Sequence, residues 1–275
     1  MLFLALALSP VLAADKFSVK LTGGLNYSIF GDINAAAKGE LYYWRDQVVQ
    51  LGGSYVDGLR SLHISPAYSI DLVYSINWEY SVSLGIGYLR AKNRSEMTLL
   101  WPLEPESTAA YYPDVRAIPI RLSVVKSIPL GERMGIFFAA GGDIYFAQFR
   151  SSDLPGGAGN VNRQKARAIG PGVRYGVGLD IKIARFIGLI FEGEGRYAKI
   201  GGFHGTLDSG GSTLPYEEKG ALWYWEFMGG PGSLTPYPYV LVQETKPSTD
   251  VFSNVRKAKA DFTGFSLMAG IRISI

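Results

Sequence analysis

The chain has 275 residues, which is enough for one large all-β domain or for two ordinary domains. A hydrophobic content of 47% is far below that of a helical membrane protein, and a net charge of +3 without a cluster of Lys and Arg argues against nucleic-acid binding. The sequence contains no cysteine, which excludes disulfides, thiolate metal sites, a cysteine nucleophile and a lipoprotein anchor. We expect no cofactor.

The first residues have the composition of a secretory signal. Residues 2–14 are uncharged and mostly apolar, and the small residues Val11 and Ala13 are placed for cleavage before Ala14. We therefore predict a signal peptide over 1–13 and a single domain over 14–275. No later apolar run reaches the roughly 18 residues of a membrane helix.

Eight later stretches alternate apolar and polar residues, as a β-strand with two different faces does. The clearest is 169–183, where the odd positions are apolar or Pro171 and the even positions are glycine or charged. Within 134–149 we assign Ile136, Phe138, Ile144 and Phe146 to the apolar face and Asp143 to the polar face. In chain order, the predicted strands are 16–30, 61–76, 80–91, 116–126, 134–149, 169–183, 186–199 and 261–275.

The connections between these strands alternate between short and long. The short ones lie at 77–79, 127–133 and 184–185, and the long ones at about 31–60, 92–115, 150–166 and 200–258. This order predicts an eight-stranded antiparallel up-and-down transmembrane β-barrel with short periplasmic turns, long extracellular loops and both termini on the periplasmic side. A soluble periplasmic β-sandwich is the alternative, with the apolar faces pointing at a protein core.

Aromatic residues gather near both ends of the predicted strands, as in the two interfacial girdles of a membrane barrel. The set near the short turns is Phe17, Tyr74, Trp78, Tyr80 and Phe186, and the set near the long loops is Tyr27, Phe30, Tyr88, Phe146 and Tyr197.

The polar faces of the strands carry nearly balanced charge. An eight-stranded barrel is narrow enough to be filled by side chains, and unpaired buried charge is costly. We therefore predict a salt-bridged polar lumen and no open pore. Glu192 and Glu194 would suit acid–base catalysis, but we expect arginines to neutralise them. The predicted network is Lys20, Asp71, Arg121, Asp143, Arg174, Asp180, Lys182, Glu192, Glu194, Arg196 and Arg272.

Two histidines invite a chemical interpretation. His63 and His204 lie on different predicted elements and do not make a zinc site. The pair His63 and Ser65 resembles locally the His-x-Ser pair of outer-membrane lipid A deacylases, which would imply a lipid-modifying enzyme. Both residues fall on the polar, inward face early in the chain, whereas that chemistry needs them at the lipid surface. We expect no enzyme and no metal site.

Two segments resemble the small outer-membrane β-barrel superfamily of OmpA-like, OmpX-like and OmpW-like barrels. They are the turn and glycine-studded strand of 78–88 and the terminal segment 264–275. The latter is similar to the C-terminal strand signal read by the barrel-assembly machinery, although it ends in Ile275 where an aromatic residue is usual. The resemblance implies a bacterial outer-membrane location and contact with membrane lipid. Because the chain stops at the eighth predicted strand, we expect no peptidoglycan-binding domain after it.

Function is expected in the loops if the barrel is a scaffold. Residues 34–51 are compatible with a short helix, and the last long connection suggests a hairpin with a Gly/Pro turn. The aromatic candidates are Tyr42, Tyr43, Trp44, Trp223, Tyr224 and Trp225. They either contact an extracellular protein, a glycan or a membrane surface, or pack together over the barrel.

The favoured function is a non-enzymatic outer-membrane barrel with a structural or adhesion-like role. The alternative is a narrow channel or a small hydrophobic-ligand transporter of the OmpW-like kind. Its sequence indications are Met268, Phe262 and Ile190 on the inward face.

Overall fold

The computed structural model describes residues 16–103, 105–154, 161–210, 216–228 and 235–275. The predicted signal segment, 1–13, lies outside these residues. Within them the chain is all-β apart from one α-helix, and the main sheet is antiparallel.

Eight strands close into a ring in which each strand pairs with a neighbour on both sides. Strand β17 pairs with β1 from Ser18↔Ser274 to Ser28↔Gly264, which completes the circuit. The closed ring contradicts the sandwich alternative and matches the eight predicted strands. In ring order they are β1 (Phe17–Ser28), β3 (Ile64–Ser75), β4 (Tyr80–Lys92), β7 (Asp114–Pro129), β8 (Met134–Leu154), β9 (Val161–Ala184), β10 (Ile187–Tyr197) and β17 (Gly264–Ser274).

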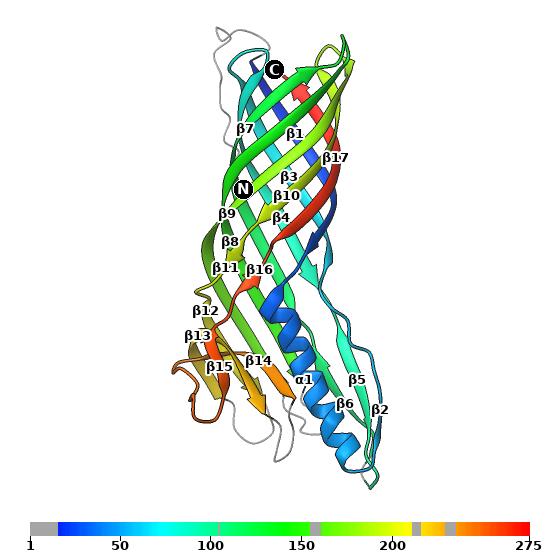
Figure 1. Ribbon diagram of the computed structural model, residues 1–275, viewed down its shortest axis with the longest axis vertical. Coiled ribbons are helices and arrows are strands. Elements are labelled where there is room, and N and C mark those ends of the chain that lie inside the picture. Colours follow the sequence, from blue (N-terminus) through cyan, green and yellow to red (C-terminus); the bar gives the residue numbers. More distant parts are fainter. Residues whose placement is uncertain (1–15, 104, 155–160, 211–215, 229–234) are drawn as a thin grey trace.

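The two ends of the ring differ. One end, which we call the turn end, carries the connections 76–79, 130–133 and 185–186 and the C-terminus (Figure 1). The other end continues into a distal extension. Three of the four predicted long connections are long there, at 29–63, 93–113 and 198–263, whereas the prediction for 150–166 is wrong because β8 and β9 extend until only 155–160 separate them. The extension contains α1 (Gly31–Gln50), β2 (Ser54–Val56), β5 (Ser95–Leu100), β6 (Ser107–Tyr111), β11 (Lys199–Ile200), β12 (His204–Gly210), β13 (Tyr216–Met228), β14 (Pro236–Gln243), β15 (Ser253–Lys257) and β16 (Ala260–Asp261).

The polarity of the two faces inverts along four of the ring strands, β4, β7, β8 and β9. In β9, Val173 and Val177 point outward and are exposed, while Arg174 between them is buried inside. Nearer the distal end of the same strand, Ala166 is buried inside and Lys165 is exposed outside. Toward the turn end the ring therefore has an apolar exterior and a charged interior, and at the distal ends of β4, β7, β8 and β9 this arrangement is reversed. The predicted start of β9 at 169 is late because that prediction followed an apolar outer face, which ends there.

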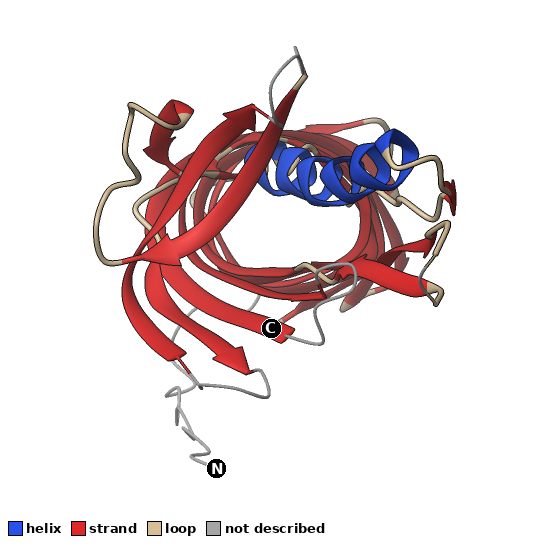
Figure 2. Cartoon of the chain, turned by 90° about the horizontal axis from the view of Figure 1, so that it is seen from below, coloured by secondary structure: helices blue, strands red, loops and turns tan. Residues whose placement is uncertain are grey.

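Helix α1 follows directly from β1 and lies over part of the ring opening (Figure 2). Phe30 adopts a left-handed conformation, with φ 52° and ψ 13°, at the N-cap of the helix. Its ring is buried and packs edge-on against Phe262, with centroids 5.5 Å apart. The prediction that Phe30 belongs to an exposed aromatic girdle is therefore wrong. Seven of the other predicted girdle residues are exposed, namely Tyr27, Tyr74, Trp78, Tyr80, Phe146, Phe186 and Tyr197.

Three contacts fix α1 to the rest of the extension. Asp32 in its first turn accepts hydrogen bonds of 2.5 and 2.7 Å from the guanidinium of Arg256. At Gly39 the helix approaches β14 so closely that a Cβ atom would lie 1.8 Å from the carbonyl oxygen of Pro238. Near its end, Asp46 accepts a 2.5 Å hydrogen bond from Tyr237 Oη. Among the described residues, no helix combines the length and the apolar composition needed to cross a bilayer.

Candidate functional site

The interior of the ring contains a continuous belt of ion pairs. Lys20 Nζ lies 2.9 Å from Glu192 and 3.5 Å from Asp71. Arg121 continues the belt from Asp71, at 3.9 Å, to Glu194. Arg174 then joins Glu194, at 3.0 Å, to Asp143, at 3.1 Å. These seven side chains come from β1, β3, β7, β8, β9 and β10. The belt therefore links six of the eight ring strands through the lumen.

Small and hydroxyl side chains complete the belt. Ser69 donates a 3.1 Å hydrogen bond to Asp71, and Ser123 accepts one from Arg174. Gly85 faces Asp71 from the next strand, and a Cβ atom there would lie 2.0 Å from the Asp71 Oδ1 atom. The glycines on the polar faces thus leave room for ion pairs that larger residues would displace.

Four members of the predicted network lie apart from this belt. Arg272 forms an ion pair with Asp180 nearer the turn end. Lys182 is exposed at that end and is not one of the buried pairs. The expectation of a carboxylate partner is wrong for Arg196. Its guanidinium donates instead to the Phe262 carbonyl at 2.9 Å and to the Ser266 hydroxyl at 2.7 Å.

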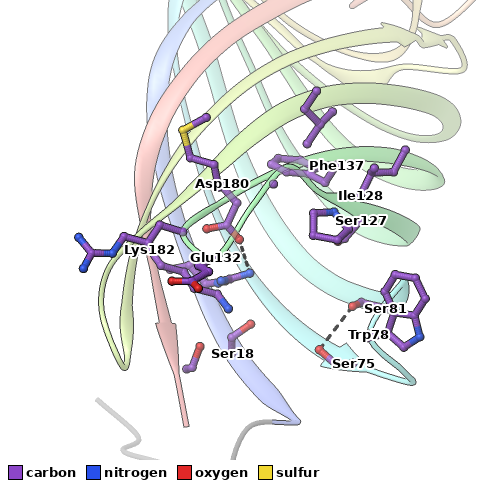
Figure 3. Close-up of a pocket in the computed structure, with 18 of the residues that line it drawn as sticks. Ser18, Ser75, Trp78, Ser81, Ser127, Ile128, Glu132, Phe137, Asp180 and Lys182 are labelled. Atoms are coloured by element: carbon purple, nitrogen blue, oxygen red, sulfur yellow. Dashed lines mark hydrogen bonds and ion pairs between the residues drawn. The ribbon is translucent and has the colours of Figure 1, made fainter.

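A cavity of about 610 Å³ opens at the turn end of the ring (Figure 3). Ser18, Ser81 and Asp180 line it, with Phe137 deeper in the ring. Lys20 of the belt lies 5.7 Å from the centre of the Phe137 ring. The cavity therefore ends in the region of the charged belt.

An apolar cluster fills the ring on the distal side of the belt. Phe262 stacks on Tyr145, with centroids 5.8 Å apart, and both side chains are at most 1% exposed. Met268 is also buried, and its sulfur lies 3.8 Å from the Thr22 hydroxyl. Ile190 is 2% exposed and lies outside this cluster, on the turn-end side of the belt opposite Asp180. The inward apolar residues that suggested a conduit are packed among protein atoms.

The six aromatic loop candidates are half-buried or buried. Tyr43 contacts Trp44 and Tyr237, with centroids 5.3 and 5.7 Å apart, and Trp225 stacks on Tyr239 at 6.3 Å. Tyr42 lies under the Arg45 guanidinium and Tyr224 under that of Arg256, at 4.1 and 4.0 Å. Trp223 lies on the same strand, in register with Leu241. These contacts fit the second interpretation, in which the aromatic side chains pack together over the eight-stranded ring.

Two buried carboxyl groups that are not among the predicted site residues lie beyond the belt, namely Glu40 of α1 and Asp153 near the distal end of β8. Glu40 and Asp153 line a cavity of about 260 Å³ together with Trp44, Trp225 and Tyr239. Asp153 accepts a 3.0 Å hydrogen bond from Asn162, and its other oxygen has no hydrogen-bond partner among the described residues. Glu40 follows Ile33 and Ala36 on the buried face of α1, and Asp153 continues the inward positions of β8. A helical and a strand periodicity could therefore have located both.

Burial makes these two groups sensitive to pH. Burial and the nearby negative charge of Asp153 raise the pKa of Glu40 to about 7, and burial raises the pKa of Asp153 to about 6. A carboxyl group with a raised pKa stabilises the fold fully below its unfolded pKa, and this contribution is lost as the pH rises through the folded value. We therefore expect the docking of α1 to weaken between pH 4 and pH 7.

Hydrogen exchange of the α1 amides, corrected for the intrinsic effect of pH, measures this loss. The Glu40→Gln variant should show a smaller pH dependence, whereas Glu217→Gln, at an exposed position, should behave as the wild type. Protection that is constant or increases between pH 4 and pH 7 would contradict the expectation.

His63 and Ser65, the pair considered for lipid-modifying chemistry, each contact a different neighbour. The His63 Nδ1 atom lies 3.2 Å from the Ser28 carbonyl oxygen, and its ring stacks on Tyr27. Ser65 accepts a 2.8 Å hydrogen bond from Asn26. No group of three or more potential metal ligands occurs in the described part of the chain. No family model and no curated protein matches this chain.

Proposed function

We propose that the chain is a non-enzymatic outer-membrane β-barrel with a structural or surface-interaction role. The eight-stranded ring spans the bacterial outer membrane, with its short turns in the periplasm and the distal extension outside the cell. Its partners are membrane lipid, the barrel-assembly machinery acting through the C-terminal strand, and an extracellular protein or glycan.

The inversion of polarity along the ring carries this proposal. Water-soluble proteins rarely expose large contiguous apolar areas, but here all eight strands expose apolar side chains around the charged belt. Beyond this band, where β4, β7, β8 and β9 continue, their exterior becomes charged and their interior apolar. A hydrocarbon layer around the band explains its apolar exterior, and water around the extension explains the charged exterior there. The band includes Leu25, Ile70, Leu84, Leu122, Ile144, Val177, Phe191 and Leu267, each at least 47% exposed.

The contents of the ring favour a scaffold over a conduit. The ion belt, the apolar cluster around Phe262 and helix α1 follow one another from the turn end to the distal end. Buried ion pairs in a narrow lumen hold their side chains in place, and breaking them leaves uncompensated charge. The narrow-channel alternative requires a path past all three layers.

The far tip of the extension supports the surface-interaction role. Apolar side chains at the end of α1, on β2 and after β5 are exposed, in contrast to the buried aromatic rings behind them. They are Val49, Leu51, Tyr55, Val56 and Leu103. Strand β2 pairs with β5, which holds part of this tip in a sheet. Exposed apolar patches of this kind mark contact surfaces.

Electrical recording in planar bilayers tests the closed lumen. We expect the purified full chain to insert without giving a stable conductance, because charged and apolar layers both block the ring. Insertion is checked independently by heat-modifiable migration on a detergent gel. A stable, large, ohmic conductance would contradict the scaffold role and favour the channel alternative.

A further inference from the structure

A cluster of cationic side chains lies on the outer face of four adjacent ring strands, at the distal edge of the apolar band. We call this cluster the basic patch. Its members come from β4, β7, β8 and β9, whose distal ends lie side by side in the ring. They are Arg90, Lys92, Arg116, Arg150, Arg163, Lys165 and Arg167.

The register of the sheet places like charges against each other within the patch. Arg90 lies opposite Arg116, and Arg150 lies opposite Lys165. Like charges directly opposite each other destabilise a sheet pair unless something neutralises them. Asp114 lies opposite both Lys92 and Arg150 in the register, so one carboxylate serves several of these cations.

Carboxylates neutralise only part of this charge. Asp114 forms ion pairs with Arg90 at 3.0 Å and with Arg116 at 2.6 Å. Asp208 lies opposite Arg163 in the register without reaching the 4.0 Å of an ion pair. Arg150, Lys165 and Arg167 are exposed, and no carboxylate lies within 4.0 Å of them among the described residues. The patch keeps a net positive charge that an external anion can neutralise.

The position of the patch identifies the anion. The next outward residues toward the turn end are Ile118 after Arg116 and Ile169 after Arg167, and both are exposed. Two residues along a strand cover about 7 Å, so the cations begin one side-chain layer beyond the apolar band. In a membrane, that layer is where lipid headgroups begin.

We propose that the basic patch binds the anionic phosphate headgroups of the membrane leaflet around the distal end of the ring. The patch holds lipid against one wall, the β4–β7–β8–β9 side, and it fixes the depth at which the ring sits. This inference rests on the proposed membrane location. Guanidinium groups suit phosphate because they donate two parallel hydrogen bonds to its oxygens.

The test compares two matched triple variants of the full chain in detergent micelles. One variant, Arg150→Gln/Lys165→Gln/Arg167→Gln, removes three cations of the patch. The control, Arg133→Gln/Lys182→Gln/Arg185→Gln, removes three exposed cations at the turn end. The unfolding temperature is measured while phosphatidylglycerol is titrated into the micelles, since a ligand that binds the folded state raises it.

We expect phosphatidylglycerol to raise the unfolding temperature of the wild type and of the control. The patch variant should need on the order of tenfold more lipid for the same rise, and added salt should weaken the effect. Equal loss in both triple variants, or no rise in the wild type, would overturn the inference.

Two further experiments distinguish lipid from a soluble anion, and failure of the basic patch from failure of the proposed membrane location. Inorganic phosphate without phosphatidylglycerol should give no comparable rise, and an equal rise would identify a soluble anion and overturn the lipid assignment. A chain that stays folded and monomeric without detergent would contradict the proposed function itself. A chain that needs detergent but ignores phosphatidylglycerol would contradict the basic patch alone.

Discussion

The Glu194→Gln variant should unfold in detergent roughly 10 °C below the wild type, because the substitution removes the carboxylate that two buried arginines share. Arg121 and Arg174 both pair with Glu194, and their side chains are only 4% and 5% exposed. Removing one partner of a buried ion pair costs about 3–5 kcal/mol, since the remaining charge stays buried without compensation. The temperature at which the folded band disappears on a heat-modifiability gel measures the change.

The Glu132→Gln variant provides the control for this experiment. Glu132 is exposed at the turn end, so the same chemical change should alter stability by less than about 0.5 kcal/mol. If Glu194→Gln melts at the wild-type temperature, the belt does not hold the ring together. The salt-bridged lumen would then be a minor feature of its stability.

The Leu122→Arg variant should fold poorly into lipid vesicles, with a loss of about 2–4 kcal/mol in folding free energy. Leu122 is 57% exposed in the middle of the apolar band on β7. An arginine at this position would meet hydrocarbon under the proposed membrane location, and the bilayer penalises that charge most near its centre. Urea titration of the vesicle-inserted protein, followed by tryptophan fluorescence, measures the free energy.

The matched substitution Leu103→Arg shows whether the cost of arginine at Leu122 comes from surrounding lipid. Leu103 is 98% exposed in the distal extension, outside the band, so the same exchange there should be nearly neutral. Water around the whole molecule would make the two exchanges similar in cost. Equal effects of Leu122→Arg and Leu103→Arg would therefore argue against the membrane location.

The ring could be predicted from the sequence because its two faces differ so strongly. In 169–183 the outer positions are bulky and apolar and the inner ones are glycine or charged, so the period of two is plain. Nearer the distal end the inner face uses small residues such as Ala147, Ala166 and Ala168, which contrast weakly with their neighbours. The extended ends of β8 and β9 were therefore missed.

The candidate site could be predicted only where a residue's role follows from which face of a strand it occupies. The alternation of inward and outward positions along each strand is enough to place Lys20, Arg121 and Glu194 in the ring interior. In the structure, Lys20 pairs there with Glu192, and Arg121 pairs with Glu194. The alternation cannot tell that Arg196, at the distal rim, meets carbonyl and hydroxyl oxygens. Helical periodicity could place Glu40 on the buried face of α1, but its position in one cavity with Asp153 and Tyr239 depends on how α1 docks on segments far away in the sequence.

The partition of the purified full chain between water and lipid tests the central claim most directly. The claim is that hydrocarbon covers the apolar exterior of the ring. On removal of detergent, the protein should float with phosphatidylcholine vesicles when they are present and aggregate when they are absent. A folded, monodisperse monomer in detergent-free buffer, left at the bottom of the gradient, would contradict the claim.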